Sequence, residues 1–401
     1  MVKCLLCEGL VTAALDLGPQ PVTCHFLEPG APAAAAFPLA LGICDRCATA
    51  QLARPFPPAA LTPRHAWVTY REPEDHLDDL VRAIASLEGI TRASRIGGIS
   101  FKDRTTIDRF GALDFRDTWC LDVRRDLGAR NPNANIESVH DLLTPEKAGE
   151  LADSRGQADV IIARHIIEHA ADPRKLLTAL SRLLRDGGYL VLEAPDSGKN
   201  MARQDYTMIW EEHALYFTDE TFRRVLTGTD FVPVRFATYP YFFEDCLVQI
   251  ARKAPAVAAS AEQGQGIARA VDDGFASYVR AFPDWTARYR QAITRLSQGA
   301  PAAIYGAGHL TAAFVNFHGL ADLFAFVVDD TPEKQGLRLP NSGLEIVPRE
   351  RLAASNAKLC LLGLSPHIEG KILDKNQDFT RQGGVFHSIF VDSPRSIRAL
   401  S

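Results

Sequence analysis

The sequence predicts an α/β protein with a small metal-binding module, a central doubly wound domain and a second Rossmann-like domain at the C-terminal end. Two observations predict the paired domains: in the middle and again near the end of the chain, short apolar segments alternate with helical patterns. The third is a pair of Cys-x-x-Cys motifs near the start. We expect domains at residues 1–60, 61–255 and 301–401, with a helical linker at 256–300.

The first element is the cysteine module, in which each Cys-x-x-Cys turn aims two thiolates at one point. The four ligands are Cys4, Cys7, Cys44 and Cys47. Two such turns predict the tetrahedral four-thiolate site that zinc prefers, rather than unrelated thiols or two disulfides. A closed site of this kind has no open coordination position, so the zinc is expected to be structural. The long gap between the two pairs predicts a loop-rich module.

The overall composition bounds the class of protein. Hydrophobic residues make up 46% of the 401 residues, which is enough to build cores, and the formal net charge is -5. An acidic balance disfavours nucleic acid and anionic membranes as partners, and no apolar run reaches spanning length. The four remaining cysteines are isolated in sequence, which is typical of reduced thiols. We therefore expect a cytoplasmic protein that acts on a small molecule.

The central domain begins with an apolar helical face over residues 77–87. Strands are predicted at 95–99, 119–123, 158–163 and 189–193, with an amphipathic helix between the last two. In such a sheet the ligand crevice lies at the carboxyl ends of the strands.

Three residues near that edge indicate a nucleotide site. Gly97 and Gly98 end the first strand, and Asp122 lies at the tip of the second. Glycines let a ligand approach the backbone, and a carboxylate at this position accepts hydrogen bonds from both ribose hydroxyls. The alternative for the two glycines is an ordinary tight turn.

Two further patterns are ambiguous by themselves. Glu212 and His213 place a carboxylate beside an imidazole, which suits a general base, although spacing alone favours a surface histidine. His165 and His169 follow a buried strand as crevice-facing polar residues, or as zinc ligands that lack an identified third partner.

The last domain repeats the alternation of strand and helix. Its first strand ends in Gly306-Ala307-Gly308, and its second ends in Asp329-Asp330. This order matches a dinucleotide fingerprint, which would suit a dehydrogenase, or a turn that packs helix on strand.

Taken in order, these motifs resemble the three-domain, zinc-containing, S-adenosylmethionine-dependent C-methyltransferases of deoxysugar biosynthesis, which act on nucleotide-linked 4-keto sugars. The segments that carry the resemblance span most of the chain. They are Cys4-x-x-Cys7, 15–21, 37–39, Cys44-x-x-Cys47, 51–52, 158–169, 193–195, Glu212-His213-Ala214-Leu215-Tyr216-Phe217, 305–308 and 328–336.

The resemblance implies a fold and a set of roles. It implies a class I methyltransferase domain in the middle of the chain, with S-adenosylmethionine near Gly97, Gly98, Asp122 and His165, and structural zinc on the four cysteines. His213 would remove the proton alpha to the ketone, and Glu212 would orient it or support its charge. His165 and Tyr70 would approach the substrate, expected to be a nucleotide-linked deoxysugar or a related metabolite of antibiotic biosynthesis.

The chain departs from the family pattern in three places. Lys102 and Arg104 occupy the loop that is acidic in the family, and would repel a sulfonium if they pointed inward. Trp210 replaces a tyrosine, with Glu211 in place of the next histidine, and residues 363–366 replace a Trp-Asn pair. Two alternatives keep the fold without methyl transfer: other chemistry on a carbonyl substrate, or a non-catalytic, zinc-bearing binding protein.

Overall fold

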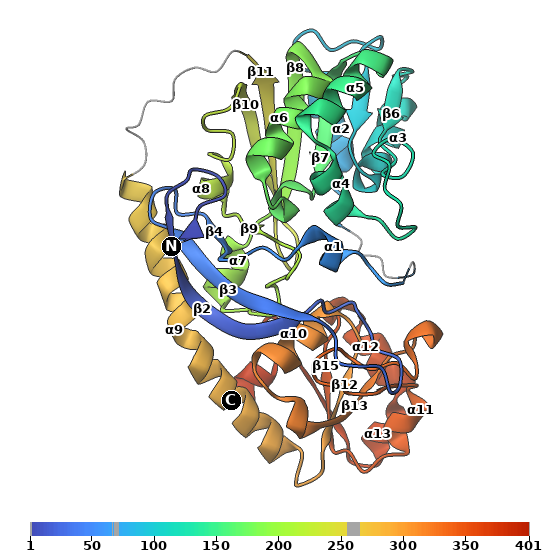
Figure 1. Cartoon of the computed structure of the whole chain (residues 1–401). Helices are drawn as coiled ribbons and strands as arrows, with labels where there is room; N and C mark the ends of the chain where they lie inside the picture. Colours follow the sequence, from blue (N-terminus) through green and yellow to red (C-terminus); the bar gives the residue numbers. More distant parts are fainter. Residues whose placement is uncertain (1, 66, 68–71, 255–264, 401) are drawn as a thin grey trace. The chain divides into compact units, whose positions relative to one another are not determined.

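The computed structural model describes residues 2–65, 67, 72–254 and 265–400. The chain forms two compact units, each built from three segments (Figure 1). The first unit comprises Met1–Ala14, Ala40–Lys199 and Glu212–Asp273, and the second comprises Leu15–Leu39, Asn200–Glu211 and Gly274–Ser401. Tyr70 and part of the expected helical linker lie outside the described residues.

An antiparallel sheet contains the cysteine motifs. Its strand order is β1 (Val2–Lys3), β2 (Leu10–Pro21), β3 (Ala36–Cys44), β4 (Ala50–Leu52) and β9 (Leu215–Tyr216). The expectation of a loop-rich module is wrong, because β2 and β3 are long strands that fill much of the gap between the two cysteine pairs. Strand β9 joins this sheet from far along the chain, with Ala50 opposite Tyr216 and Gln51 opposite Leu215.

The first unit is centred on a six-stranded sheet. Its order is β10 (Phe231–Tyr239), β11 (Cys246–Lys253), β8 (Leu184–Pro195), β7 (Ala158–Arg164), β5 (Ile96–Gly98) and β6 (Thr118–Cys120). The four strands from β8 to β6 pair in parallel, and β10 and β11 pair antiparallel at one edge. Six of the seven residues of β7 are buried, which agrees with the mostly apolar run at 158–163 and with a parallel strand covered on both faces.

Helices cover both faces of this sheet (Figure 1). The helices α4 (Ile136–Leu142), α5 (Pro145–Arg155) and α6 (Pro173–Leu183) share one hydrophobic core with it. The helices α2 (Leu77–Ala85) and α3 (Arg104–Ala112) share a second core. Leu77, Leu80, Val81 and Ile84 are all buried, as the helical spacing predicted.

Short helical elements complete this part of the chain. They are α1 (Pro58–Leu61), η1 (Phe101–Asp103), η2 (Ile167–His169), α7 (Gly198–Arg203) and α8 (Asp219–Phe222), followed by the long α9 (Gln265–Leu296). The two 3₁₀ helices, η1 and η2, follow β5 and β7 closely, so they place side chains at the carboxyl ends of those strands.

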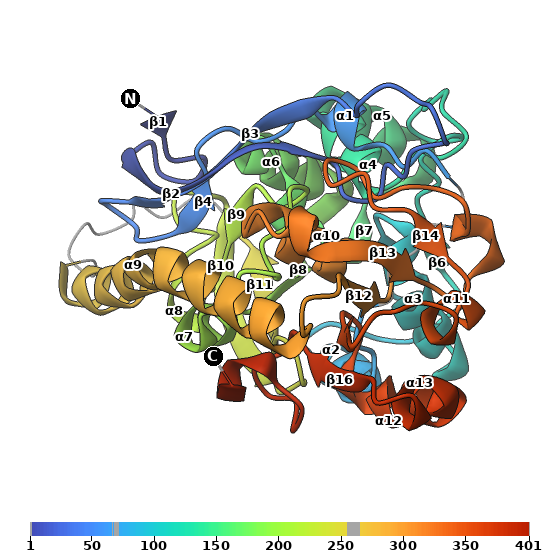
Figure 2. The same ribbon diagram turned by 90° about the horizontal axis from the view of Figure 1, so that it is seen from below.

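The second unit contains a fully parallel sheet. Its order is β14 (Ile346–Val347), β13 (Phe324–Val328), β12 (Ala302–Tyr305), β15 (Leu359–Leu362) and β16 (Val385–Ser388). The helices α11 (Glu350–Ala353), α12 (Pro366–Lys375) and α13 (Gln377–Arg381) share one core with it, and α10 (His309–Phe317) follows β12 (Figure 2). The 3₁₀ helices are η4 (Ala321–Leu323), η5 (Pro332–Lys334) and η6 (Ile397–Leu400).

Both doubly wound sheets follow the plan that the sequence predicted, so the α/β fold class is confirmed. In the described part of the chain, no helix combines the length and the apolar character needed to cross a membrane.

Candidate active site and zinc centre

The four predicted zinc ligands converge in the first unit. The Sγ atoms of Cys4 and Cys47 are 3.6 Å apart, and those of Cys7 and Cys44 are 3.5 Å apart. All four lie within 4.8 Å of one another. Four thiolates about 2.3 Å from one zinc ion lie roughly 3.8 Å apart, so the cluster has the size of a tetrahedral site. Hydrogen bonds within the cluster lower the pKa of Cys7 and of Cys47 and raise the pKa of Cys4, and the pKa of Cys44 is also raised, as expected for neighbouring thiols that share protons.

Strand β4 links this cysteine cluster to the segment that follows His213. The buried Gln51 accepts a hydrogen bond from the backbone N–H of Leu5 at 3.0 Å, and it lies on the strand that pairs with β9. The N–H of Leu52 donates to the carbonyl of Ala214 at 3.0 Å. The zinc-bearing sheet therefore holds the residue directly after His213 in place.

Gly97 and Gly98 are buried within β5 rather than in the loop that follows it. A Cβ at Gly97 would lie 2.4 Å from the ring of Trp119, and one at Gly98 would lie 2.7 Å from the Cβ of Asp103. Both glycines thus allow close packing of β5 against its neighbours.

Asp103 organises the loop after β5. Its carboxylate accepts hydrogen bonds from the backbone N–H groups of Ile99 at 2.8 Å, Ser100 at 2.9 Å and Arg164 at 2.9 Å. Burial raises the pKa of Asp103 to about 6 despite these bonds. Sequence reasoning assigned Asp103 no role, although a carboxylate five residues after the end of β5 can accept hydrogen bonds from the backbone of the loop between them.

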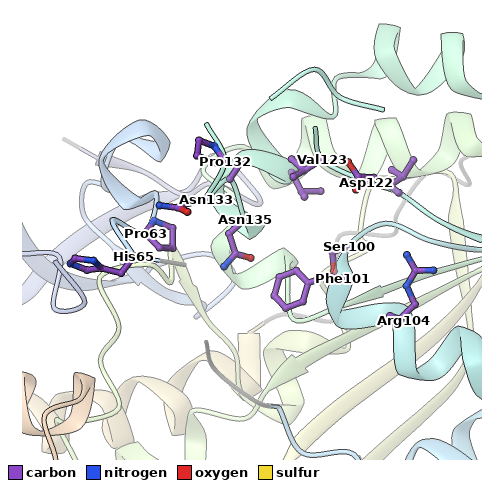
Figure 3. Close-up of a pocket in the computed structure, with 13 residues that line it drawn as sticks. Pro63, His65, Ser100, Phe101, Arg104, Asp122, Val123, Pro132, Asn133 and Asn135 are labelled. Carbon is purple, nitrogen blue, oxygen red and sulfur yellow. The ribbon is translucent and has the colours of Figure 1, made fainter. Parts of the chain in front are cut away.

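A pocket of about 340 Å³ lies where β5 and β6 end, a volume that suits a small ligand (Figure 3). Asp122 lies on its wall and is exposed; one of its oxygens accepts hydrogen bonds from the N–H groups of Arg124 at 3.0 Å and Arg125 at 2.8 Å. The lining residues are Pro63, His65, Ser100, Phe101, Arg104, Leu121, Asp122, Val123, Pro132, Asn133, Ala134, Asn135 and Val139. The loop after Gly98 and the carboxylate of Asp122 thus face the same space.

A buried ionic cluster occupies the carboxyl ends of β7 and β8. His165 follows β7 directly with a φ of 46°, a left-handed conformation that is uncommon outside glycine and that concentrates at functional sites. Its Nε2 lies 2.8 Å from Glu193 Oε1 as an ion contact whose N–H is not aligned for a hydrogen bond, and its Nδ1 lies 3.6 Å from Glu72.

The pKa shifts in this cluster follow from the ion pairs that its buried side chains form. Burial alone would lower the pKa of His165, but Glu72 and the neighbouring acceptors raise it well above its usual value. Burial would raise the pKa of Glu193, but Arg164, 3.1 Å away, holds it well below the ordinary range. The surrounding carboxylates therefore favour the imidazolium form of His165.

Lys102 does not stand as an isolated positive charge. Its ammonium group pairs with the carboxylate of Glu72, and only 10% of its side chain is exposed. Burial would lower the pKa of Lys102, but Glu72 and Glu168 raise it overall. Arg104 is exposed at the pocket rim. Glu72 thus offsets the charge that would otherwise repel a sulfonium.

A second cluster brings His213 together with the segment after β7. The rings of His169 and His213 lie 4.6 Å apart, edge to face. One side-chain atom each of Glu168, His169 and His213 lies within 4.8 Å of the other two, a donor set that can hold a divalent metal. Burial, followed by the charge of His213, lowers the pKa of His169 well below its usual value. Glu212 and His213 are both half-buried.

Trp210 and Glu211 belong to the second unit and form a network with His309. The Glu211 carboxylate accepts hydrogen bonds from the Thr23 N–H at 2.5 Å and hydroxyl at 2.8 Å, and lies 3.4 Å from His309. The Trp210 ring stacks on that of His309, with centroids 3.6 Å apart. Trp210 and Glu211, which both depart from the family pattern, therefore interact with His309, a partner that their position in the sequence did not indicate.

The glycine motif of the second unit is tied to its own chain. Gly306 has a φ of 102°, and the N–H of Ala307 donates to Asp329 at 2.7 Å. Asp329 also pairs with Lys334 at 3.2 Å. The acid that a dinucleotide ribose would need is thus engaged within the loop.

Three family models match successive parts of the chain. Residues 4–61 match the model described as "Putative zinc binding domain", residues 97–235 match a methyltransferase domain, and residues 248–390 match a C-methyltransferase C-terminal domain. The C-methyltransferase NovU of Streptomyces niveus is 26% identical over 381 residues, covering 91% of this chain and 89% of that protein.

Solved structures also resemble part of the chain. The 1,6-didemethyltoxoflavin-N1-methyltransferase of Burkholderia thailandensis covers 45% of this chain and 79% of its own, with a TM-score of 0.30 and 15% identity. The magnesium protoporphyrin IX methyltransferase of Synechocystis covers 48% and 89%, with a TM-score of 0.28 and 13% identity. Likenesses at this level assign no activity.

The domain models and the site together define an S-adenosylmethionine-dependent methyltransferase with a structural zinc ion. Within that class, the order of a zinc-binding domain, a methyltransferase domain and a C-methyltransferase C-terminal domain, with the similarity to NovU, supports a C-methyltransferase.

Proposed function

We propose that this enzyme methylates the carbon alpha to a ketone in a nucleotide-linked deoxysugar or a related small metabolite in the cytoplasm. The carbon-directed domain model and the relationship to NovU support the reaction type. The observation that carries the proposal is the placement of His213 against the buried pair Glu168 and His169. A half-buried imidazole beside a buried carboxylate is suited to accept a proton.

The pocket at the ends of β5 and β6 is the proposed site of the cofactor. Asp122, on the pocket wall, would accept hydrogen bonds from the ribose hydroxyls. Gly97, Gly98 and His165 do not line this pocket, and they would lie behind or beyond it, toward the methionine portion. The bound cofactor would supply an electrophilic methyl group. Glu72 would support binding of its positive charge by pairing with Lys102.

His213 is the proposed base, with Glu212 orienting it from the adjacent position. His213 would accept the proton alpha to the ketone as the C–H electron pair moves into an enolate, and His165 and Tyr70 would contact the substrate. The cluster excludes water because Glu168 and His169 are buried, which strengthens each charge interaction within it.

Replacement of His213 tests this proposal. His213→Ala should slow methyl transfer to a nucleotide-linked 4-keto sugar, such as thymidine-diphosphate 4-keto-6-deoxyglucose, by about 10²–10⁴-fold, because a positioned base is worth that factor. Solvent deuterium incorporation alpha to the ketone should disappear as well, while calorimetry shows unchanged affinity for S-adenosylmethionine. His387→Ala, at a half-buried histidine on β16, is the matched control. Full turnover by His213→Ala would exclude His213 as the base.

A further inference from the structure

Glu168 is a buried carboxylate whose oxygens lack hydrogen bonds within the described residues. The side chain of this residue on η2 is 1% exposed. Two histidine nitrogens lie within ion-pair distance of it, His165 Nδ1 at 3.5 Å and His169 Nε2 at 3.9 Å. A buried carboxylate without hydrogen-bond donors is unfavourable unless a positive charge faces it. His165 supplies one positive charge but shares it with Glu193 and Glu72, and neither oxygen of Glu168 accepts a hydrogen bond from the described part of the chain, so Glu168 can still stabilise a second cation beside it.

The titratable and charged groups that face Glu168 are Glu72, Lys102, His165, His169, His213 and Glu244. Most of these groups either are paired with another charged group or are neutral. Lys102 pairs with Glu72, and His165 lies closer to Glu193, at 2.8 Å, than to Glu168. Burial, followed by Glu72, raises the pKa of Glu244 to about 8, which keeps it neutral at pH 7.

His169 and His213 remain as the imidazoles beside Glu168. Burial lowers the pKa of His169 well below its usual value, which favours its neutral form, so His169 supplies no charge to Glu168. His213 is the less buried of the two and approaches from a different segment, held by the strand pairing of β9. It is the neighbour of Glu168 that gains a positive charge when it accepts a proton.

We propose that Glu168 is the positioning residue that stabilises the His213 imidazolium, an inference that rests on the proposed role of His213 as the base. The proton leaves the substrate carbon and bonds to a His213 ring nitrogen, and the C–H electron pair enters the enolate. Glu168 stays ionised throughout, and solvent later takes the proton from His213. Atoms of the two side chains come within 4.8 Å, inside the range over which opposite charges act strongly.

Glu212 is the natural comparison, because it is the carboxylate adjacent to His213 in sequence. It is half-buried, whereas Glu168 is enclosed. Water screens a partly exposed pair, so a carboxylate at Glu212 stabilises the imidazolium less than one at Glu168. The structure thus assigns charge stabilisation to Glu168 and leaves orientation to Glu212.

The test is an NMR titration of histidine side chains in the zinc-loaded protein labelled with ¹⁵N-histidine. His213→Asn identifies the His213 signal. In Glu168→Gln, the acid dissociation constant of the His213 imidazolium should rise by about tenfold or more, the effect of losing an opposite charge at this distance. Glu212→Gln should change it less, and Glu168→Asp should restore part of the effect. An unchanged constant in Glu168→Gln, or a larger change in Glu212→Gln, overturns the proposal.

Two controls separate this inference from its alternatives. Adding one equivalent of Co²⁺ beyond the zinc content tests whether Glu168, His169 and His213 hold a metal instead. Selective broadening of both histidine signals, lost in Glu168→Gln, would overturn the proposal in favour of a metal site. The titration needs no substrate, so it remains decisive for Glu168 even if the turnover of His213→Ala excludes His213 as the base. Thermal unfolding of Glu168→Gln and Glu168→Asp verifies that both variants fold.

Discussion

Asp122 offers the sharpest test of the cofactor site, because its two oxygens have separate tasks. One oxygen accepts hydrogen bonds from the backbone N–H groups of Arg124 and Arg125 and so forms the turn after β6. The other has no hydrogen-bond partner among the residues that the structure describes, and it is available to the ribose. The alanine variant therefore removes both tasks, whereas Asp122→Asn retains an oxygen for the turn and loses the charge.

The expected losses of cofactor affinity and of stability follow from the separate tasks of the two Asp122 oxygens. A hydrogen bond to a charged group contributes about 1.5–3 kcal/mol, so Asp122→Asn should weaken binding of S-adenosylmethionine by roughly 10- to 150-fold. Asp122→Ala should weaken it at least as much and also lower the melting temperature, because the two turn hydrogen bonds contribute about 1 kcal/mol each. Calorimetry with S-adenosylhomocysteine should show the same loss, since the two ligands share the ribose. Unchanged affinity in Asp122→Asn would refute the assignment of the ribose to this carboxylate.

Two further predictions concern the metal and pH. Elemental analysis should find about one zinc ion per chain, and Cys7→Ser or chelation should increase hydrogen exchange at the β4–β9 pairing; retained protection there would contradict the coupling. Burial lowers the pKa of His140 from 6.5 to about 4, so the folded state resists a proton that the unfolded chain accepts. The free energy of unfolding should therefore fall by about 3 kcal/mol as pH drops from about 6.5 to about 4, and denaturant titrations of His140→Gln should lack this part of the loss.

Sequence patterns predicted individual helices, strands and the metal site well, because each of these patterns depends on residues that are close together in the sequence. The apolar face of α2 and the mostly apolar run of β7 both predicted the burial that the structure shows. The two cysteine motifs identified a metal site because tetrahedral coordination demands that spacing. The carboxylate of Asp122 was expected at the end of its strand for the same kind of reason, and it lines the pocket.

The pairing of distant side chains could not be predicted in this way. Lys102 appeared as a positive charge in the wrong place, because its partner Glu72 precedes it by a whole helix and strand. Likewise, a half-buried histidine after Glu212 has the pattern of a surface residue until η2 brings Glu168 and His169 beside it. Such pairs depend on which strands end at the same edge of the sheet, and sequence order alone does not specify this.

The structural zinc site also bears on the position of the proposed base, His213. A closed four-thiolate site takes no part in chemistry, yet it fixes the strand that follows its last ligand. Only two residues, Ala48 and Thr49, separate Cys47 from β4, and β4 pairs with β9, so backbone hydrogen bonds connect the zinc site to the segment beside His213. A base must lie within hydrogen-bond reach of the proton that it removes, so a small shift of this strand would affect rate more than cofactor affinity. We therefore expect loss of the metal to slow catalysis through this one short, buried strand, although a closed site gives the metal no contact with the substrate.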